Sequence, residues 1–369
     1  MKTEKKRRLR RNTRRSLINY AIVIAAYAIV QALNAGGNIK SSLQGQLVPI
    51  CAYIVMAVSL NLVVGVSGEL SLGHAGFMSI GAFTGIVAAT ALQAAIPMGW
   101  VRLLIAMVVG AAFAGLFGLL VGVPVLRLRG DYLAIVTLAF GEIVKNIMNI
   151  LYVGIDEKGV HIAALEGSRL VLAEGGVPLI KGPMGAVGVA KLSTFTAGFL
   201  LVLVTLFVVQ NLVDSRAGRA ILALRDNRIA AESVGLSVTK YKLMAFVTSA
   251  ALAGAAGVLY GLNYTGLAAK KFDFNTSILV LVFVVLGGMG NIRGSIIAAA
   301  LLTILPEALR EFADFRMLAY AIVLILVMLA TNNPTMQQFF AAVMEKVRGT
   351  FRELFQKNGE TVKGGGNHE

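Results

Sequence analysis

Long apolar runs alternate with short polar connections along most of this chain. A transmembrane helix needs about 20 consecutive apolar residues, and many of these runs come close to that length. We expect membrane-spanning helices at residues 17–33, 47–66, 72–93, 102–126, 131–153, 192–213 and 243–262. The pattern therefore predicts an all-α polytopic membrane protein.

Residues 277–310 are also apolar, but glycines interrupt them at Gly287, Gly288 and Gly290. Each apolar half is short for a full span, so the segment predicts either two short helices that meet at a glycine-rich turn or one re-entrant pair. Broken helices at membrane depth occur where they are buried in protein or line a cavity. These glycines are therefore candidates for a translocation path, and tight packing alone is the alternative. With a last span at 316–330, we expect about ten transmembrane helices.

The composition and charge agree with a membrane protein. Of the 369 residues, 57% are hydrophobic and 14% are charged, which is more apolar surface than a soluble domain could bury. The formal net charge is +15, and nine lysines and arginines lie within the first fifteen residues. Basic segments of membrane proteins lie on the cytoplasmic side and attract anionic lipid. The charge therefore indicates topology in a lipid bilayer rather than nucleic-acid binding.

Charge also divides the chain into regions. We expect a basic cytoplasmic arm at 1–16, a transmembrane region at 17–331 and a cytoplasmic tail at 332–369. The connection at 154–191 balances acidic and basic residues and is expected outside. The connection at 214–242 carries six basic residues against three acidic ones and is expected inside.

The inner connection at 214–242 is patterned more regularly than a simple tether. Asp226 or Asn227 can cap a helix start, residues 228–234 then form a short helix, and Gly235 stands where a left-handed helix end is favoured. Such a helix is either a docking element or a solvated loop helix. The second alternative stays open because amphipathic surface helices are common. The candidate docking residues are Arg225, Asp226, Arg228, Ala230, Ala231 and Gly235.

The sequence lacks the motifs that carry enzymatic chemistry. It has no phosphate-binding loop, no His-Glu-x-x-His, no cluster of cysteine and histidine, and no nucleophile elbow. The single cysteine, Cys51, lies in an apolar run and is expected to be a small core residue. We therefore expect no enzyme activity, no metal site and no cofactor bound by this chain, and energy for any transport would come from a partner.

Few ionisable residues fall within the expected spans. Glu142 is the clearest, and it is either half of an ion pair with Lys145 one turn away or part of a substrate path. His74 lies in a stretch of small residues and is either a hydrogen-bonded packing residue or a path residue. Thr137, in the same span as Glu142, completes the candidates for the path.

Four stretches of the sequence carry a resemblance to a known family. They are SGELSLGHAGFMSIGAF (67–83), LRLRGDYLAIVTLAFGEI (126–143), GRAILALRDNRIAAESVGLSVTKYKLMAFVTSAALAGAAGVLYG (218–261) and SILVLVFVVLGGMGNIRGSIIAAALL (277–302). In this order they resemble the LivM-type permease subunit of bacterial ABC importers for branched-chain amino acids.

The resemblance implies the helical permease fold of that superfamily, with a cytoplasmic coupling helix within 214–242. Ala230, Ala231 and Gly235 stand at the alanines and the glycine of the superfamily's EAA motif, whereas Ile229 stands where that motif has its glutamate. An ionic role of that glutamate therefore does not carry over. The external connection also lacks a TGG-type motif that family members often carry.

The resemblance further implies partners. It indicates cytoplasmic ABC ATPase subunits that use ATP and Mg²⁺, a second homologous permease subunit, and an external binding protein that delivers leucine, isoleucine, valine or a related amino acid. It implies a place in the bacterial inner membrane, with both termini in the cytoplasm. The alternatives are an ABC permease for a sugar or nucleoside, a carrier driven by a proton or sodium gradient, and a structural membrane scaffold.

Overall fold

The computed structural model describes residues 2–36, 41–128, 130–156, 159–164 and 176–309, with a few isolated positions beyond and without side-chain placement for 2–16 and 131. The expected tail at 332–369, and most of the expected span at 316–330, lie outside these residues. Met1–Glu307 form one compact unit, and a second unit begins at Ala308.

Helices dominate the described residues, and their bounds follow the apolar pattern. They are α1 (Lys2–Ala35), α2 (Ser41–Asn61), α3 (His74–Ala91), α4 (Gly99–Val125), α5 (Asp131–Ile150), α6 (Phe195–Asp214), α7 (Arg216–Asp226), α8 (Arg228–Ser233), α9 (Val238–Gly261), α10 (Phe274–Gly287) and α11 (Ile292–Ala308). Within the described part of the chain, seven helices are long and apolar enough to cross a membrane. They coincide with the seven spans expected before residue 263, which confirms the predicted fold class.

Three features differ from the sequence-based expectation. The expected basic arm and the first span belong to one helix, because α1 continues from Lys2 to Ala35 without a break, which the sequence did not predict. Helix α2 passes into a π-helical turn, η1 (Leu62–Ser67), that ends at Gly68 in a left-handed conformation. The expected span at 131–153 ends earlier, at Ile150, because a β-strand begins at the next residue.

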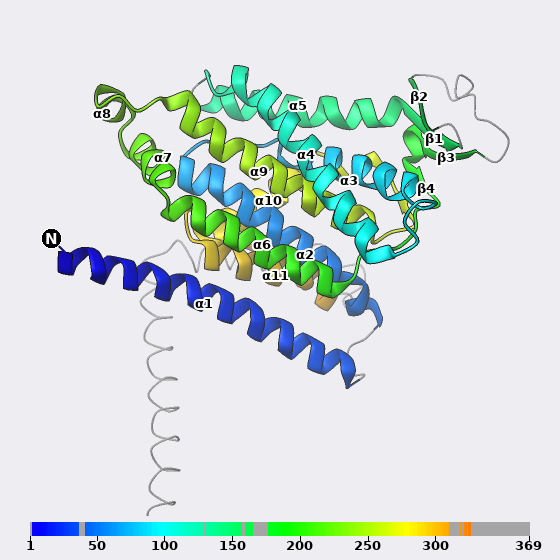
Figure 1. Ribbon diagram of the computed structural model, residues 1–369, viewed down its shortest axis with the longest axis horizontal. Coiled ribbons are helices and arrows are strands. Elements are labelled where there is room, and N and C mark those ends of the chain that lie inside the picture. Colours follow the sequence, from blue (N-terminus) through cyan, green and yellow to red (C-terminus); the bar gives the residue numbers. More distant parts are fainter. Residues whose placement is uncertain are drawn as a thin grey trace, which may run out of the picture. The chain divides into compact units, whose positions relative to one another are not determined.

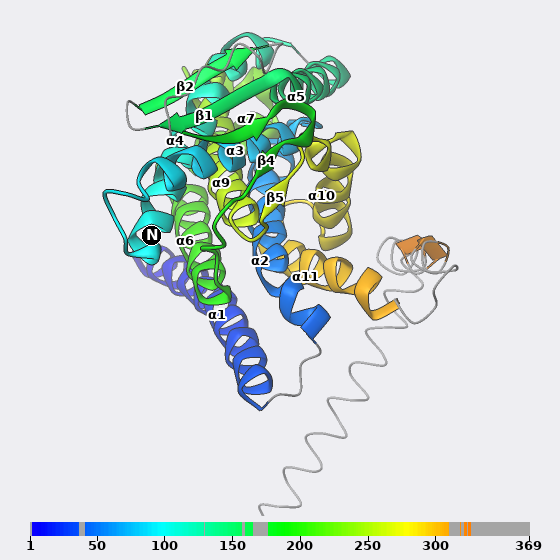
Figure 2. The same cartoon turned by 90° about the vertical axis from the view of Figure 1, so that its right-hand side faces the viewer.

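The connection expected outside contains a small antiparallel sheet that the apolar pattern did not predict. Its strands are β1 (Leu151–Asp156), β2 (Gly159–Ala164), β3 (Val177–Lys181), β4 (Ala186–Val187) and β5 (Gly266–Leu267). They are ordered β2-β1-β3-β4-β5, and Figure 2 shows the sheet facing the viewer. Strand β5 comes from the connection between α9 and α10, so the sheet ties two distant connections together.

Helices α2, α3 and α9 form the centre of the bundle. Of their apolar windows, 83% is buried within the chain for α2 and 72% for α3 and for α9, against 28% for α4 and 22% for α5. Small residues let the central helices approach closely: Gly110 of α4 lies against Gly81 of α3, and Gly118 of α4 lies against Ala250 of α9. Small residues are commonly used in this way between membrane helices.

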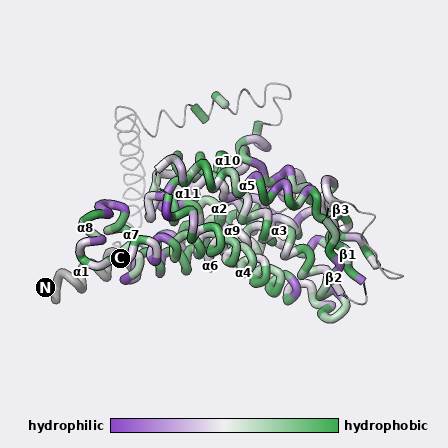
Figure 3. The backbone as a smooth tube through the Cα atoms, turned by 90° about the horizontal axis from the view of Figure 1, so that it is seen from above, coloured by the Kyte–Doolittle hydropathy of each residue, from purple (hydrophilic) through white to green (hydrophobic). Residues whose placement is uncertain are grey.

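The two ends of the bundle carry different structures. Figure 1 shows α7, α8 and the start of α1 at one end and the sheet at the other. In Figure 3, hydrophobic residues run along the helices, and hydrophilic ones gather around α7 and α8 and near the sheet. The connections at 154–191 and 214–242 therefore lie at opposite ends, as the predicted topology requires.

Candidate functional site

The connection at 214–242 folds into two helices rather than one. Ser215 caps α7, since its hydroxyl accepts a hydrogen bond from the backbone N–H of Gly218 at 3.0 Å. Asn227 caps α8 in the same way, through the N–H of Ala230 at 3.0 Å. Of the two predicted caps, Asn227 is therefore the one used. Helix α7 was not predicted from the sequence, where that stretch was described only as a polar connection.

Helix α8 ends as predicted. Gly235 has a φ of +85°, a conformation that favours glycine, and the N–H of Leu236 donates to the carbonyl of Ala231 at 3.1 Å. Ala231 is buried with Leu224 of α7 and Val238 of α9. These contacts fix the position of α8 on the rest of the connection.

The surface of α8 is more apolar than a solvated helix requires. Ile229 is 81% exposed and Val234 is 75% exposed. Ala230 is exposed beside them, whereas Ala231 faces inward, and Arg228 pairs with Glu232 at 3.0 Å. Ile229 and Val234 were not among the predicted docking residues, although two large apolar side chains in a polar connection were the available signal.

Arg225 links α7 to the end of the second span. Its Nε and Nη2 donate to a carboxylate oxygen of Asp226 at 3.1 and 2.9 Å, and its Nη1 donates to the carbonyl oxygen of Gly65 in η1 at 2.8 Å. The last carbonyl groups of a helix lack partners within it and are available for such bonds. The side chain of Arg225 therefore joins the 214–242 connection to the membrane bundle.

The junction of α2 and η1 holds the break between α10 and α11. The amide oxygen of Asn61 accepts from the N–H of Gly290 at 2.7 Å, and its nitrogen donates to the hydroxyl of Ser295 at 3.0 Å. Gly290 has a φ of +81°, and a Cβ placed on Gly65 would lie 2.1 Å from the nitrogen of Gly290. The helix break predicted from glycines is confirmed, and it lies against η1.

Gly287 and Gly288 take part in the same break. A Cβ on Gly287 would lie 2.4 Å from the backbone nitrogen of Ser295, and Gly288 has a φ of +88°. Both observations agree with a packing role. A role of Gly287, Gly288 and Gly290 in a translocation path stays a prediction.

His74 and Thr137 both lie close to the start of α3. His74 is 2% exposed, and its Nε2 lies 2.9 Å from the hydroxyl of Ser59. The Thr137 hydroxyl accepts from the N–H of Leu72 at 3.0 Å and donates to the carbonyl of Ala134 at 3.0 Å. Both side chains are buried and hydrogen-bonded, which agrees with the packing alternative for His74.

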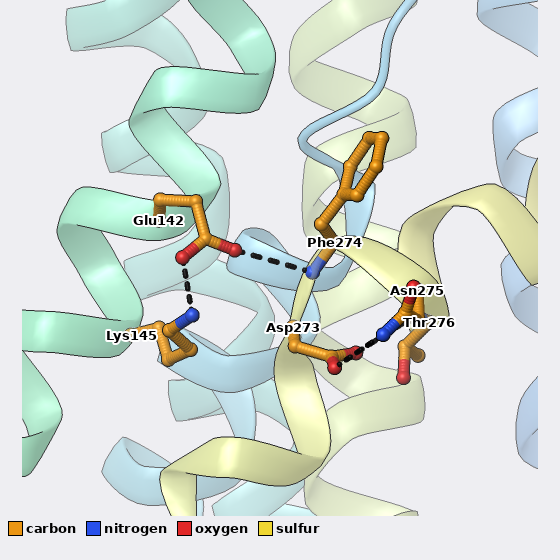
Figure 4. A network of polar contacts seen from close by, with 6 residues as sticks. All are labelled: Glu142, Lys145, Asp273, Phe274, Asn275 and Thr276. Atoms are coloured by element: carbon orange, nitrogen blue, oxygen red, sulfur yellow. Dashed lines mark hydrogen bonds and ion pairs between the residues drawn. The ribbon is translucent and has the colours of Figure 1, made fainter.

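Glu142 is on α5, and its side chain contacts the start of α10. One carboxylate oxygen pairs with the ammonium of Lys145, and the other accepts from the backbone N–H of Phe274 at 3.2 Å (Figure 4). Asp273 caps α10 through the N–H of Thr276 at 3.0 Å. The predicted ion pair is confirmed. The pair is also partly open, with 33% of the Glu142 side chain and 21% of the Lys145 side chain exposed.

Comparison with known proteins decides the family. Residues 42–331 match the family described as branched-chain amino acid transport system / permease component. The chain belongs to this permease family. It is 40% identical, over 288 residues, to the high-affinity branched-chain amino acid transport system permease protein LivM of Salmonella typhimurium and to that of Escherichia coli. Each alignment covers 75% of this chain and 66% of the relative, so the chain spans just under two thirds of their length.

More distant relatives of this permease include different transport systems. The LivH permease protein of E. coli is 25% identical over 296 residues, covering 75% of this chain and 89% of the relative. The fructose import permease protein FruG of Bifidobacterium longum is 24% identical over 266 residues, covering 70% and 72%. No solved structure matches the chain significantly.

The predicted residues of this permease thus fall into separate groups. Arg225 and the residues of α8 lie at one end of the bundle, and Gly287, Gly288 and Gly290 join them through η1. Glu142 belongs to neither group, because it lies on α5 and contacts the start of α10. Among the described residues, no group of histidine, cysteine and carboxylate side chains could hold a metal ion.

Proposed function

We propose that the chain is a membrane-spanning subunit of an ATP-driven importer for branched-chain or related amino acids. Helix α8 carries this proposal, because Ile229 on the helix and Val234 at its C-cap are exposed at one end of a bundle of this permease family. An exposed apolar pair on a fixed, capped helix suits a protein partner. That partner would be a cytoplasmic ABC ATPase, which hydrolyses ATP with Mg²⁺ while this chain catalyses no reaction.

The proposed importer has two further components, a second permease subunit and an external binding protein. A second homologous permease subunit would complete the path, and the match to both LivM and LivH relatives supports a pair of unlike subunits. An external binding protein would dock at the sheet end and deliver the amino acid. The basic residues of α1 begin at the α7–α8 end (Figure 1), which supports a cytoplasmic placement for both in a bacterial inner membrane.

A sugar permease is the second candidate, because FruG and the ribose import permease protein RbsC of Haemophilus influenzae are distant relatives, each 24% identical. Uptake by cells that express the complete system separates the candidates. We expect radiolabelled leucine to enter, uptake to stop when ATP is depleted, and uptake to persist when the proton and sodium gradients are collapsed. Entry of fructose or ribose without leucine would favour the second candidate, and loss with the gradients would favour a secondary carrier.

The substitution Arg225→Glu tests the connection between α7 and the bundle. It removes a charged hydrogen bond to Gly65 and places two carboxylates side by side. Hydrogen bonds to charged groups contribute about 1.5–3 kcal/mol, so we expect leucine uptake to fall about tenfold or more in quantitative uptake assays.

Arg219→Glu is the matched control for this substitution. Arg219 lies on the same helix and is exposed, but it bonds to the carbonyl of Asp214 within its own connection. Uptake by Arg219→Glu should stay close to that of the unmodified chain. Equal uptake by both variants would show that the bond to η1 does not transmit coupling.

A further inference from the structure

Helix α5 carries a polar stripe that the proposed function does not use. Glu142, Lys145, Asn146 and Asn149 are spaced i, i+3, i+4 and i+7, which places them on one face of a helix. Asn146 is exposed and the other three are partly exposed. Beyond Glu142 and Lys145, α5 carries no lysine, arginine, histidine, aspartate or glutamate after its first residue.

The other faces of α5 have different surroundings. Its buried face, which includes Ala134, Thr137 and Val144, packs toward the bundle. A separate flank exposes apolar side chains, with Ile143 57% and Ile147 46% exposed. An apolar flank suits lipid. A stripe with two charges and two amides does not, because ionisable residues within the membrane face protein or water.

Glu142 lies near the middle of α5, and so near the middle of a membrane that α5 would span. Glu142 lies eleven residues after the first residue of α5, which is about 16 Å along a helix, near the centre of a hydrocarbon core about 30 Å thick. Asn146 and Asn149 continue from there toward the sheet, since β1 follows directly on α5.

Helix α10 does not extend over the outer part of the stripe. The short helices η3 (Gly182–Met184) and η4 (Ala269–Phe272) contact α5, and Asn146 stays exposed. Helix α10 begins beside Glu142, whose carboxylate accepts from the N–H of Phe274, as Figure 4 shows. It has 14 residues and ends at Gly287, next to the break on η1. Helix α10 thus runs from the level of Glu142 away from the sheet, and Asn146 and Asn149 lie beyond its start.

We propose that this stripe forms the outer half of the translocation path and recognises the charged ends of a zwitterionic amino acid. Glu142 would face the ammonium group and Lys145 the carboxylate. The paired side chains place a negative and a positive charge at one depth. A zwitterionic amino acid carries an ammonium and a carboxylate group, which are opposite in charge to these side chains. The desolvation cost of each charge is then offset by an opposite charge. A neutral sugar offers no such exchange, so this inference rests on the proposed amino-acid function.

Thiol labelling tests whether water reaches the stripe. In a Cys51→Ser background, single substitutions Asn146→Cys and Asn149→Cys are compared with Ile143→Cys and Ile147→Cys at the same depths. In the assembled complex, we expect a membrane-impermeant thiol reagent to modify the first two at least about tenfold faster. Equal rates, or faster labelling of the isoleucine positions, would overturn the wetted path.

Uptake measurements test the recognition of the zwitterion. With reconstituted complexes and radiolabelled leucine, we expect Glu142→Gln and Lys145→Met each to lower the leucine moved per ATP hydrolysed about tenfold or more, as for lost charged hydrogen bonds. Lys145→Arg keeps the charge and should recover most of the ratio, and Ile147→Val, on the apolar flank, should retain it. A purely structural ion pair would lower the unfolding temperature and leave the ratio unchanged.

The failure of this inference is distinguishable from failure of the proposed function. If the unmodified complex moves leucine and both charge variants keep the ratio, the recognition role is wrong while the importer stands. If the unmodified complex moves a sugar and no amino acid, the proposed function is wrong and the zwitterion assignment falls with it. Labelling still decides in that case whether the stripe is wetted.

Discussion

An aspartate at position 229 is expected to abolish coupling to the ATPase while leaving the protein folded. Ile229 is 81% exposed on α8, so its side chain contributes little to the packing of the chain itself. Burying an isoleucine against a partner contributes about 1.5–3 kcal/mol, and a buried, unpaired carboxylate adds a desolvation cost. Ile229→Asp should therefore weaken ATPase binding by about a hundredfold, measured by co-purification and by leucine uptake.

The control for this prediction is Ile229→Leu, which keeps an apolar side chain of the same size and should retain binding. The unfolding temperature of both variants should match that of the unmodified chain. Normal ATPase binding by Ile229→Asp would contradict the docking role of α8.

Ala231 is a poorer position for this test than the sequence suggested. Ala231→Arg would insert a long charged side chain among Leu224 and Val238, where Ala231 is 4% exposed. It would disturb the fold of the 214–242 connection together with any partner contact. The superfamily motif identified the helix, but it did not identify which of its side chains face outward.

A methyl group added at Gly65 is expected to destabilise the bundle severely. A Cβ at this position would lie 2.0 Å from the amide oxygen of Asn61 and 2.1 Å from the backbone nitrogen of Gly290. Both atoms belong to the bond that holds the break between α10 and α11. Overpacking costs about 1–3 kcal/mol, and a buried donor left unpaired costs a similar amount. Gly65→Ala should therefore lower the unfolding temperature in detergent by several degrees or more.

Gly45→Ala provides a matched control within the same span. No heavy atom lies within 4 Å of a Cβ built on Gly45 of α2. Alanine is favoured over glycine in a helix, so the unfolding temperature should stay the same or rise slightly. An equal decrease for both variants would mean that the contact of η1 with Gly290 does not stabilise the bundle.

The apolar pattern predicted the membrane helices because each span needs a run of apolar residues that is visible locally. The start and the end of α8 were predicted from Asn227 and Gly235, since these residues act on the backbone within a few positions. The Glu142–Lys145 pair was predictable for the same reason, because residues three apart face each other on a helix.

The rest depended on contacts between distant residues. Strands β4 and β5 have two residues each and pair across about eighty positions, so neither has a local signal. The bond between Arg225 and Gly65 joins positions 160 apart. The burial of His74 and Thr137 follows from how α3 packs against α2 and α5, which no spacing along the chain reveals.

Purification of the tagged chain from its native membrane in mild detergent tests the central claim most directly. We predict that an ATPase with a phosphate-binding loop and a second permease subunit are recovered with it, and that Ile229→Asp loses the ATPase and keeps the permease subunit. Recovery of the chain without any ATPase, even after cross-linking, would contradict the account and favour a gradient-driven carrier.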